Sequence, residues 1–427
     1  MTSRRREFAM PIRPTGDGWA PRRRLAIGVA ILAISATAIG CGGSDDSGTA
    51  AAGGQDEPFE FLCLSDTTGP AKIYGEQQEL SCNAATDHVN ANGGVNGHQI
   101  KLTHVSTNGD PATAVSALQK FISENGKPDL VWPGEGSSTV AAALPIIKRE
   151  GILSFSGSDA GGLLVDDEYP LSFAAQATPA TPTQAAAKWF SDNGVKFVGI
   201  LEADIDYNQG ETPFMEKALD ELGIRHTVVG FDRETLDLTP QMDKLKSSGV
   251  DGIFFEGLGP PVGFSLDARA KLDWDVPWVG DLSASSLDLT TLVSSPSALK
   301  DTKLVVFRPN PASQAELPGV VAYKKAGEAH ADIAKTDKVP ISSPIAVWDA
   351  LLLVAGAAKQ ANSTEAEAVA GALENLNDET ATNPLLTLYG EYRYSPDHHV
   401  VVGATAEDYP VIDPGPVSGG HIQAPAD

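Results

Sequence analysis

The sequence has few cysteines, few histidines and few basic residues. Of its 427 residues, 3 are cysteines and 8 are histidines, and 31 lysines and arginines stand against 56 aspartates and glutamates, which gives a formal net charge of −25. Such a surface repels nucleic acid and anionic lipid, so neither is an expected partner. The histidines are scattered, and the adjacent pair His398–His399 has no cysteine or acid cluster at ligand spacing. The sequence therefore predicts no metal site.

Long hydrophobic runs are also scarce. The one strongly apolar run, Leu25–Ile39, has fifteen residues without a charge, whereas a membrane-spanning helix needs about 20. Arg22–Arg24 precedes this run, and small residues lead from it to Cys41. A basic segment, a short apolar segment and small residues in that order are typical of a secretory signal. We therefore predict that residues 1–40 are a signal peptide, with Met1 or Met10 as its start.

The residues around Cys41 resemble a bacterial lipobox. In lipoproteins the thiol of this cysteine is lipidated, and the cysteine becomes the mature N-terminus. The resemblance implies an exported protein that is lipid-anchored through Cys41 to the outer face of the cell membrane; an ordinary secretory signal with a chance cysteine is the alternative. Without residues 1–40, 24 basic and 54 acidic residues remain, a net charge near −30. Residues 41–58 are small, polar and acidic, which predicts a flexible tether.

Two cysteines, Cys63 and Cys82, remain after Cys41. Outside the cytoplasm, two cysteines nineteen residues apart can pair. Cys63 lies in an expected strand and Cys82 in the helix that follows it, and these two elements should pack together. We predict a disulfide between them, with two buried thiols as the alternative.

Short apolar runs alternate with helical patterns from Phe59 onward. The first series predicts strands at 59–64, 100–105, 130–132 and 153–155, and the second predicts strands at 197–201, 227–231, 253–255 and 278–280. Repeated strand–helix units indicate parallel sheets with helices on both faces. The chain that remains after the signal peptide is longer than a single hydrophobic core usually supports, so two lobes are expected. The predicted fold is therefore α/β, with two Rossmann-like lobes and a parallel sheet in each.

Polar loops follow the expected strands. Ligands of open α/β sheets bind at the carboxyl ends of the strands, so these loops are the candidate site. In the first lobe they offer hydroxyls and helix N-termini, which suit an anionic group; they span 65–70, 134–139 and 156–159. In the second lobe they offer carboxylates and a tyrosine, at 204–207, 256–259 and 281–283. This division suits a zwitterion, although Ser, Asp and Gly are also ordinary turn residues.

One segment carries a family signature. Asn90–Gly97 (NANGGVNG), followed by Gln99 and Ile100, resembles the NAxGGINGxxI signature of the leucine/isoleucine/valine-type substrate-binding proteins of ABC importers. Weaker motifs of the same family follow in order at 68–70, 108–111, 136–139 and 207–210. The resemblance runs from about Phe59 to the C-terminus. It implies the type I periplasmic-binding fold, with two lobes, a ligand cleft between them and three hinge crossings.

The resemblance also implies lobe limits. It places the crossings near residues 176, 310 and 386. The N-terminal lobe would then comprise 59–176 and 310–386, the C-terminal lobe 177–309 and 387–412, and a tail the remaining residues 413–427.

Seven ligand-binding residues are carried over by the resemblance. Ser137 and Ser138 match the loop that binds a substrate carboxylate in the family. Ser158 or Asp159 matches the adjacent loop, which carries a hydroxyl group. Those that match the side-chain pocket, the tyrosine of the second lobe and the ammonium-binding acid are Tyr74, Tyr207 and Asp281. Leu258 and Gly259 stand where the family has an aromatic pair.

The resemblance implies a binding protein without catalysis or cofactor. Such a protein captures a small polar solute, an amino acid or a related amide or carboxylate, and delivers it to ABC permease subunits. A ligand-sensing receptor subunit of the same fold is the alternative. An enzyme is disfavoured, because Gly134–Thr139 lacks the third glycine of a dinucleotide fingerprint and the sequence has no G-x-S-x-G elbow.

Overall fold

The computed structural model describes residues 57–68, 72–159, 161–164, 168–333 and 338–425, apart from the side chains of Ile73, Asp206 and Tyr207. The predicted signal peptide, Cys41 and most of the predicted tether lie outside these residues. Within the described residues, no helix has the length and apolar character needed to cross a membrane.

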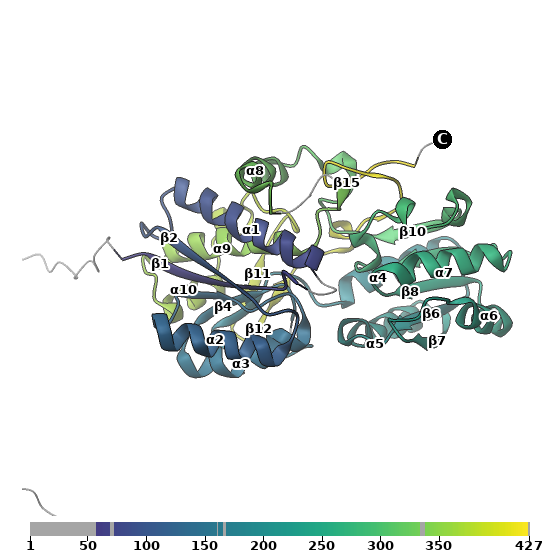
Figure 1. The fold of residues 1–427 in the computed structure, drawn as a ribbon, viewed down its shortest axis with the longest axis horizontal. Coiled ribbons are helices and arrows are strands. Elements are labelled where there is room, and N and C mark those ends of the chain that lie inside the picture. Colours follow the sequence, from purple (N-terminus) through teal and green to yellow (C-terminus); the bar gives the residue numbers. More distant parts are fainter. Residues whose placement is uncertain (1–56, 69–71, 160, 165–167, 334–337, 426–427) are drawn as a thin grey trace, which may run out of the picture. The chain divides into compact units, whose positions relative to one another are not determined.

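The first sheet contains five parallel strands in the order β2-β1-β3-β4-β5 (Figure 1). Four of them were predicted from the sequence, and β5 was not. The strands are Phe59–Ser65 (β1), Ile100–Ser106 (β2), Leu130–Trp132 (β3), Leu153–Ser156 (β4) and Ser172–Ala174 (β5). We call this sheet and the helices that cover it the first lobe.

Helices from two distant parts of the chain cover the first sheet. Those between its strands are Lys72–Ala91 (α1), Pro111–Asn125 (α2) and Ser137–Glu150 (α3). Those from the later part of the chain are Pro318–Gly327 (α8), Ala346–Ala361 (α9), Ala366–Leu373 (α10) and Asp378–Ala381 (α11). Figure 1 shows α2 and α3 on one face of the sheet and α1 on the other, where α1 packs against α8 and α9. The first lobe is therefore discontinuous in sequence.

Local sequence signals set the ends of these helices. Asp110 caps α2 by accepting a hydrogen bond from the N–H of Thr113 (2.7 Å), and Pro111 fills the first turn. Gly94 ends the turn after α1 in a left-handed conformation, with φ of 72°. A Cβ at Gly94 would also overlap the carbonyl oxygen of His98. The glycine of the family signature is therefore required by the backbone.

The second sheet has six strands in the order β13-β10-β9-β8-β6-β7. They are Phe197–Ala203 (β6), Arg225–Phe231 (β7), Gly252–Glu256 (β8), Trp278–Gly280 (β9), Thr302–Val305 (β10) and Val411–Ile412 (β13). Its helices are Ala180–Asp192 (α4), Asp206–Glu221 (α5), Thr239–Ser248 (α6) and Pro260–Lys271 (α7). Five strands are parallel, and β13 pairs with β10 in the antiparallel sense. The predicted two-sheet α/β fold is thus confirmed, with an antiparallel edge strand added. We call this sheet and its helices the second lobe.

A hairpin changes the predicted lobe limits. It is formed by Arg393–Ser395 (β11) and His398–Val402 (β12), and it lies against β5 of the first lobe. The buried Tyr394 hydroxyl donates to the carbonyl oxygen of Ala174 (3.0 Å). Residues 387–412 were assigned from the sequence to the second lobe, but a limit at 387 does not fit this contact. The chain joins the second sheet only at β13, so the third crossing lies between β12 and β13.

The end of the chain is structured as well. Residues 413–427 were predicted from the sequence as a tail. They instead contain a hairpin of two short strands, Val417–Ser418 (β14) and His421–Ile422 (β15). The backbone N–H of Ile422 donates to the carbonyl oxygen of Asn310 (2.8 Å). This hairpin therefore covers the segment that leads from β10 to α8.

Cys63 and Cys82 lie where β1 packs against α1. Their sulfur atoms form a disulfide bond, and both side chains are fully buried. His104 lies beside them, and the three residues form the one group of three potential metal ligands found among the described residues, with ligand atoms within 4.8 Å. Cysteine binds metals as the thiolate, and neither cysteine of a disulfide is a thiolate. While the bond is intact, Cys63 and Cys82 therefore cannot bind a metal as thiolates.

We expect that removing the disulfide by a Cys63→Ala/Cys82→Ala double change will lower the free energy of unfolding by about 3 kcal/mol. The physical reason is that a cross-link over this sequence separation restricts the unfolded chain. Urea unfolding of the two proteins measures the difference. As a direct check, thiol titration of the denatured, unreduced protein should label neither Cys63 nor Cys82, and labelling of both would contradict the bridge.

Candidate functional site

A cavity of about 230 Å³ lies between the two lobes. All six loops that the sequence singled out at strand ends contribute side chains or backbone to its wall, through Asp66, Glu135, Ser158, Ile205, Leu258 and Ser283 among others. Carboxyl ends of parallel strands meet at one edge of each sheet, which explains why loops distant in sequence converge here. A cavity of this size suits a small solute.

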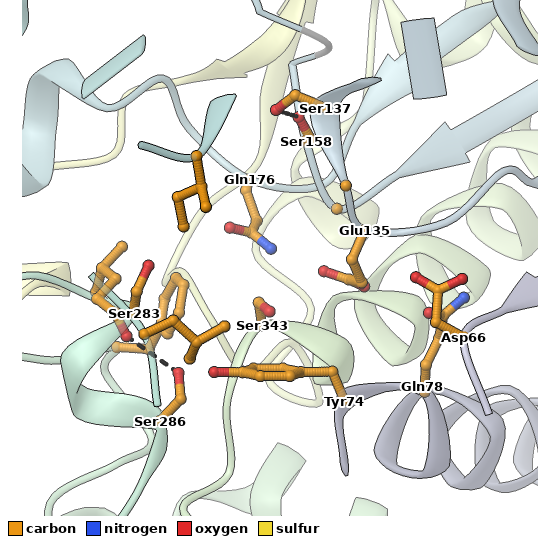
Figure 2. A pocket seen from close by; sticks show the side chains of 17 residues that line it. Asp66, Tyr74, Gln78, Glu135, Ser137, Ser158, Gln176, Ser283, Ser286 and Ser343 are labelled. Atoms are coloured by element: carbon orange, nitrogen blue, oxygen red, sulfur yellow. Dashed lines mark hydrogen bonds between the residues drawn. The ribbon is translucent and has the colours of Figure 1, made fainter. Parts of the chain in front are cut away.

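Hydroxyl groups of the first lobe line one part of the cavity. The Oγ atoms of Ser137 and Ser158 are 2.8 Å apart, and Figure 2 shows the pair together at one end of the site. Ser137 is also the first residue of α3, and its N-cap, Gly136, offers no side-chain acceptor. The first backbone N–H groups of α3 are therefore open to a ligand acceptor, and the helix dipole favours negative charge there.

Two acidic side chains lie near these hydroxyls. Figure 2 shows Glu135 and Asp66 on one side of the cavity, with Ser283 and Ser286 on the opposite side. Burial raises the pKa of Glu135 to about 8; a hydrogen bond with Ser343 opposes that shift and the nearby Asp66 adds to it. Among the described residues that line the cavity, none is lysine, arginine or histidine. The site is therefore acidic, with Glu135 largely protonated at neutral pH.

Tyr74 of α1 reaches across the cavity toward the second lobe. Its hydroxyl points toward Ser286, and its ring lies along one side of the site (Figure 2). Burial holds the pKa of Tyr74 well above its usual value, so the phenol stays neutral. Gln176, on the segment that leaves β5, points its amide into the cavity, and its buried Nε2 has no hydrogen-bond partner among the described residues. Gln176 therefore offers a donor to a ligand.

The second lobe contributes the apolar part of the wall. Its side chains there are Ile205, Leu258, Leu282 and Phe307. Leu282 and Phe307 are nearly fully buried, at 6% and 3% exposure. The cavity thus combines a polar side with an apolar side, the usual composition of a small-molecule site.

The structure brings three of the seven sequence-predicted residues to the cavity and leaves three outside its wall. Tyr74, Ser137 and Ser158 line it. Ser138 is exposed, and Asp159 accepts a hydrogen bond from the N–H of Gly161 (3.0 Å) instead of lining the cavity. The side chain of Tyr207 lies outside the described residues.

Asp281 lies inside the second lobe, not in the cavity wall. It is 1% exposed, and its carboxylate accepts hydrogen bonds from Asn208 Nδ2 (2.9 Å) and from the backbone N–H of Ala284 (2.8 Å). Burial raises its pKa to about 7. Glu211 and Glu256 are equally buried near it, and burial also raises their pKa values well above the usual range. We call Asp281, Glu211 and Glu256 the acid cluster.

Several cavity residues were not predicted from the sequence. Asp66 and Glu135 stand in loops that were singled out, but the resemblance assigned no role to them. Gln176 and Phe307 lie between regular elements, close to the first and second crossings, and Ser343 begins a short 3-10 helix, Ser343–Ile345. The only sequence signal for Gln176 is its place at the expected crossing near 176.

Comparison with known proteins identifies the fold family. The sequence profile described as periplasmic binding protein matches residues 62–406, most of the chain. The chain belongs to this family. Its members bind ligands and are not enzymes, which confirms the predicted absence of catalysis.

Individual relatives agree with that assignment. A leucine-, isoleucine-, valine-, threonine- and alanine-binding protein of Pseudomonas aeruginosa is 24% identical over 332 residues, which cover 77% of this chain and 85% of that protein. A periplasmic binding protein type 1 from Bordetella pertussis has the same fold, with a TM-score of 0.70 at 18% identity over 84% of this chain and 96% of that one.

A third similar structure is a branched-chain amino acid transporter substrate-binding protein from Streptococcus pneumoniae, solved in complex with isoleucine. It has a TM-score of 0.65 at 16% identity, over 84% of this chain and 100% of that one. This periplasmic binding protein therefore has the family's two-lobed α/β fold.

Proposed function

We propose that this periplasmic binding protein captures a small polar solute, an amino acid or a related amide or carboxylate, in the cavity between its lobes and delivers it to an ABC permease. One observation carries the proposal: the strand-end loops of both lobes converge on one cavity with a polar and an apolar side. The names of its relatives, which mention branched-chain amino acids and a transporter, support the ligand class and the transport role.

A ligand-sensing receptor subunit is the second candidate function. The cavity would serve capture and sensing equally, because both functions require only that ligand binding shifts the protein from one conformation to another. Uptake of a labelled ligand separates them: loss of the protein should abolish uptake if it serves transport and leave uptake intact if it serves sensing alone. Export and lipid anchoring through Cys41 belong to the same proposal, and the mass of the mature N-terminus tests them.

We expect Ser137→Ala to weaken solute binding by about 1.5–3 kcal/mol, because the Ser137 hydroxyl lines the cavity beside the open N-terminus of α3. Ser138→Ala is the matched control: the neighbouring hydroxyl is exposed and lies outside the cavity wall, so affinity should stay within twofold. Calorimetry with the amino acid that stabilises the protein most in a thermal-shift screen gives both values. Equal losses in the two variants would favour the sequence-based assignment of both serines.

A further inference from the structure

The wall of the cavity carries acidic groups without a compensating base. Asp66 and Glu135 are the acidic residues among the described side chains that line it, and lysine, arginine and histidine are missing from that set. A buried anion in such a place would lack a charged partner, which is costly. A cationic ligand group would instead gain one.

Glu135 lines this cavity and has an acceptor atom without a partner among the described residues. Its Oε1 atom is buried and has no hydrogen-bond partner among the described residues, and Ser343 lies near the same carboxyl group. Gly157 makes room for the carboxyl group, because a Cβ at that position would overlap its oxygens. Buried polar atoms are normally paired, so an unpaired one in a binding cavity indicates a ligand contact.

The other carboxylates near the cavity are already engaged. Asp66 accepts hydrogen bonds through Oδ1 from the N–H of Gly109 (2.6 Å) and from the Thr107 hydroxyl. Asp281, the acid that the sequence suggested for a cationic ligand end, caps a turn inside the second lobe. Glu135 is therefore the carboxyl group best placed to receive a new partner.

We propose that Glu135 binds the cationic end of the solute, an ammonium or similar nitrogen, while Ser137, Ser158 and Gln176 bind its acceptor end. Both polar ends of the ligand then contact the first lobe or the adjoining crossing, and its apolar part faces the second lobe. This inference rests on the proposed function and adds the identity of the residue that selects the ligand charge.

Binding of a cation should also depend on pH. With a pKa of about 8, Glu135 is protonated in the free site and must lose its proton to pair with the cation. The titratable groups that face it are Asp66, whose negative charge favours the protonated form, and Tyr74, which burial keeps neutral. Affinity should therefore rise with pH between 6 and 8, by up to about tenfold per unit, with release of a proton.

The test is calorimetric titration with amino acids and with the matching acids that lack the amino group, for example L-leucine against 4-methylpentanoate. Wild type should bind the amino acid at least about 30-fold more tightly than its partner acid. Glu135→Gln, a neutral isostere, should weaken amino-acid binding at least about 30-fold and abolish the pH dependence. Glu150→Gln removes a carboxylate at the other end of α3, outside the cavity wall, and should stay within twofold.

Three results would overturn the inference. Partner acids that bind wild type as tightly as the amino acids would exclude a cation contact. Unchanged amino-acid affinity in Glu135→Gln, with a melting temperature like that of wild type, would exclude Glu135. Affinity that falls as pH rises would show that protonated Glu135 donates to an anion. Each leaves solute capture intact, whereas failure of all amino acids and all partner acids to bind would refute the proposed ligand class as well.

Discussion

Asp349→Ala is expected to lower the free energy of unfolding by about 3–5 kcal/mol. Asp349 lies on α9, is fully buried and accepts four hydrogen bonds. Two come from the backbone N–H and hydroxyl of Thr387 (2.8 and 3.0 Å), one from the N–H of Leu388 (2.9 Å) and one from the hydroxyl of Tyr392 (2.7 Å). Alanine would leave these buried donors without an acceptor, and each unsatisfied donor costs about 1–3 kcal/mol.

The effect should reach the first crossing. The Tyr392 hydroxyl also lies 3.2 Å from the carbonyl oxygen of Ala175, and Tyr389, nearby in the same segment, accepts a hydrogen bond from the N–H of Ala177 (2.9 Å). Asp349 thus fixes a segment that holds the chain where it leaves β5, next to Gln176. Solute affinity should fall together with stability.

Urea unfolding of Asp349→Ala against wild type tests this prediction. Asp192→Ala is the control, since Asp192 is an exposed acid whose ion pair with Lys188 is at the surface; its change should be within about 1 kcal/mol. If the Asp349 and Asp192 variants had the same free energy of unfolding, the hydrogen bonds around Asp349 would not stabilise the fold.

Raising the pH from 5 to 8 is expected to lower the free energy of unfolding by at least about 3 kcal/mol. Burial raises the pKa of Asp281 to about 7, that of Asp349 to about 6 and that of Glu135 to about 8. A carboxyl group with a raised pKa holds its proton more tightly in the folded state than in the unfolded state. Its stabilising effect is complete below the unfolded pKa, near 4, and is lost as the pH rises to the folded pKa.

Within the acid cluster, burial and then the nearby charge of Asp281 raise the pKa values of Glu211 and Glu256. Thr212 donates to Glu256 Oε2 (2.5 Å), but Glu256 Oε1 and Glu211 Oε2 have no partner among the described residues. The cluster has more acceptors than donors, and protonation supplies the missing donors. Ionisation would place charges close together in a buried site, which is costly.

Urea unfolding at pH 5 and pH 8 measures the predicted loss. Glu211→Gln removes one titrating group and adds an amide donor, so its loss should be smaller than that of wild type. Glu221→Gln is the control on the same helix, because Glu221 is exposed, and it should show the wild-type loss. Stability that is constant or rises over this range would contradict the raised pKa values.

Much of the fold could be predicted because alternating apolar runs and turns reveal long strands and helices. β1 and β8 are seven- and five-residue runs that are nearly all buried, and such runs are recognisable. β5 and β10 have three and four residues and include Ser172, Thr302 and Lys303. They become strands only because neighbouring strands offer a free edge, which sequence periodicity does not show.

The candidate site was predicted in part for a similar reason. Strand-end loops can be read from the sequence, and all six reach the cavity. The direction of a side chain within a loop depends on its partners: Asp281 turns inward because Asn208 and the Ala284 N–H bind it, whereas Glu135 faces the cavity. The parts played by Phe307 and Ser343 follow from how distant segments pack around the cavity, a tertiary property without a local signature.

The most direct test of the central claim is a crystal structure of the wild-type protein with the amino acid that binds it most tightly. We predict density for the solute in the cavity between the lobes, with its acceptor end at Ser137 and Ser158 and its nitrogen at Glu135. Solute density elsewhere, for example in the groove between α1 and α8 beside Tyr323, with only water between the lobes, would contradict it.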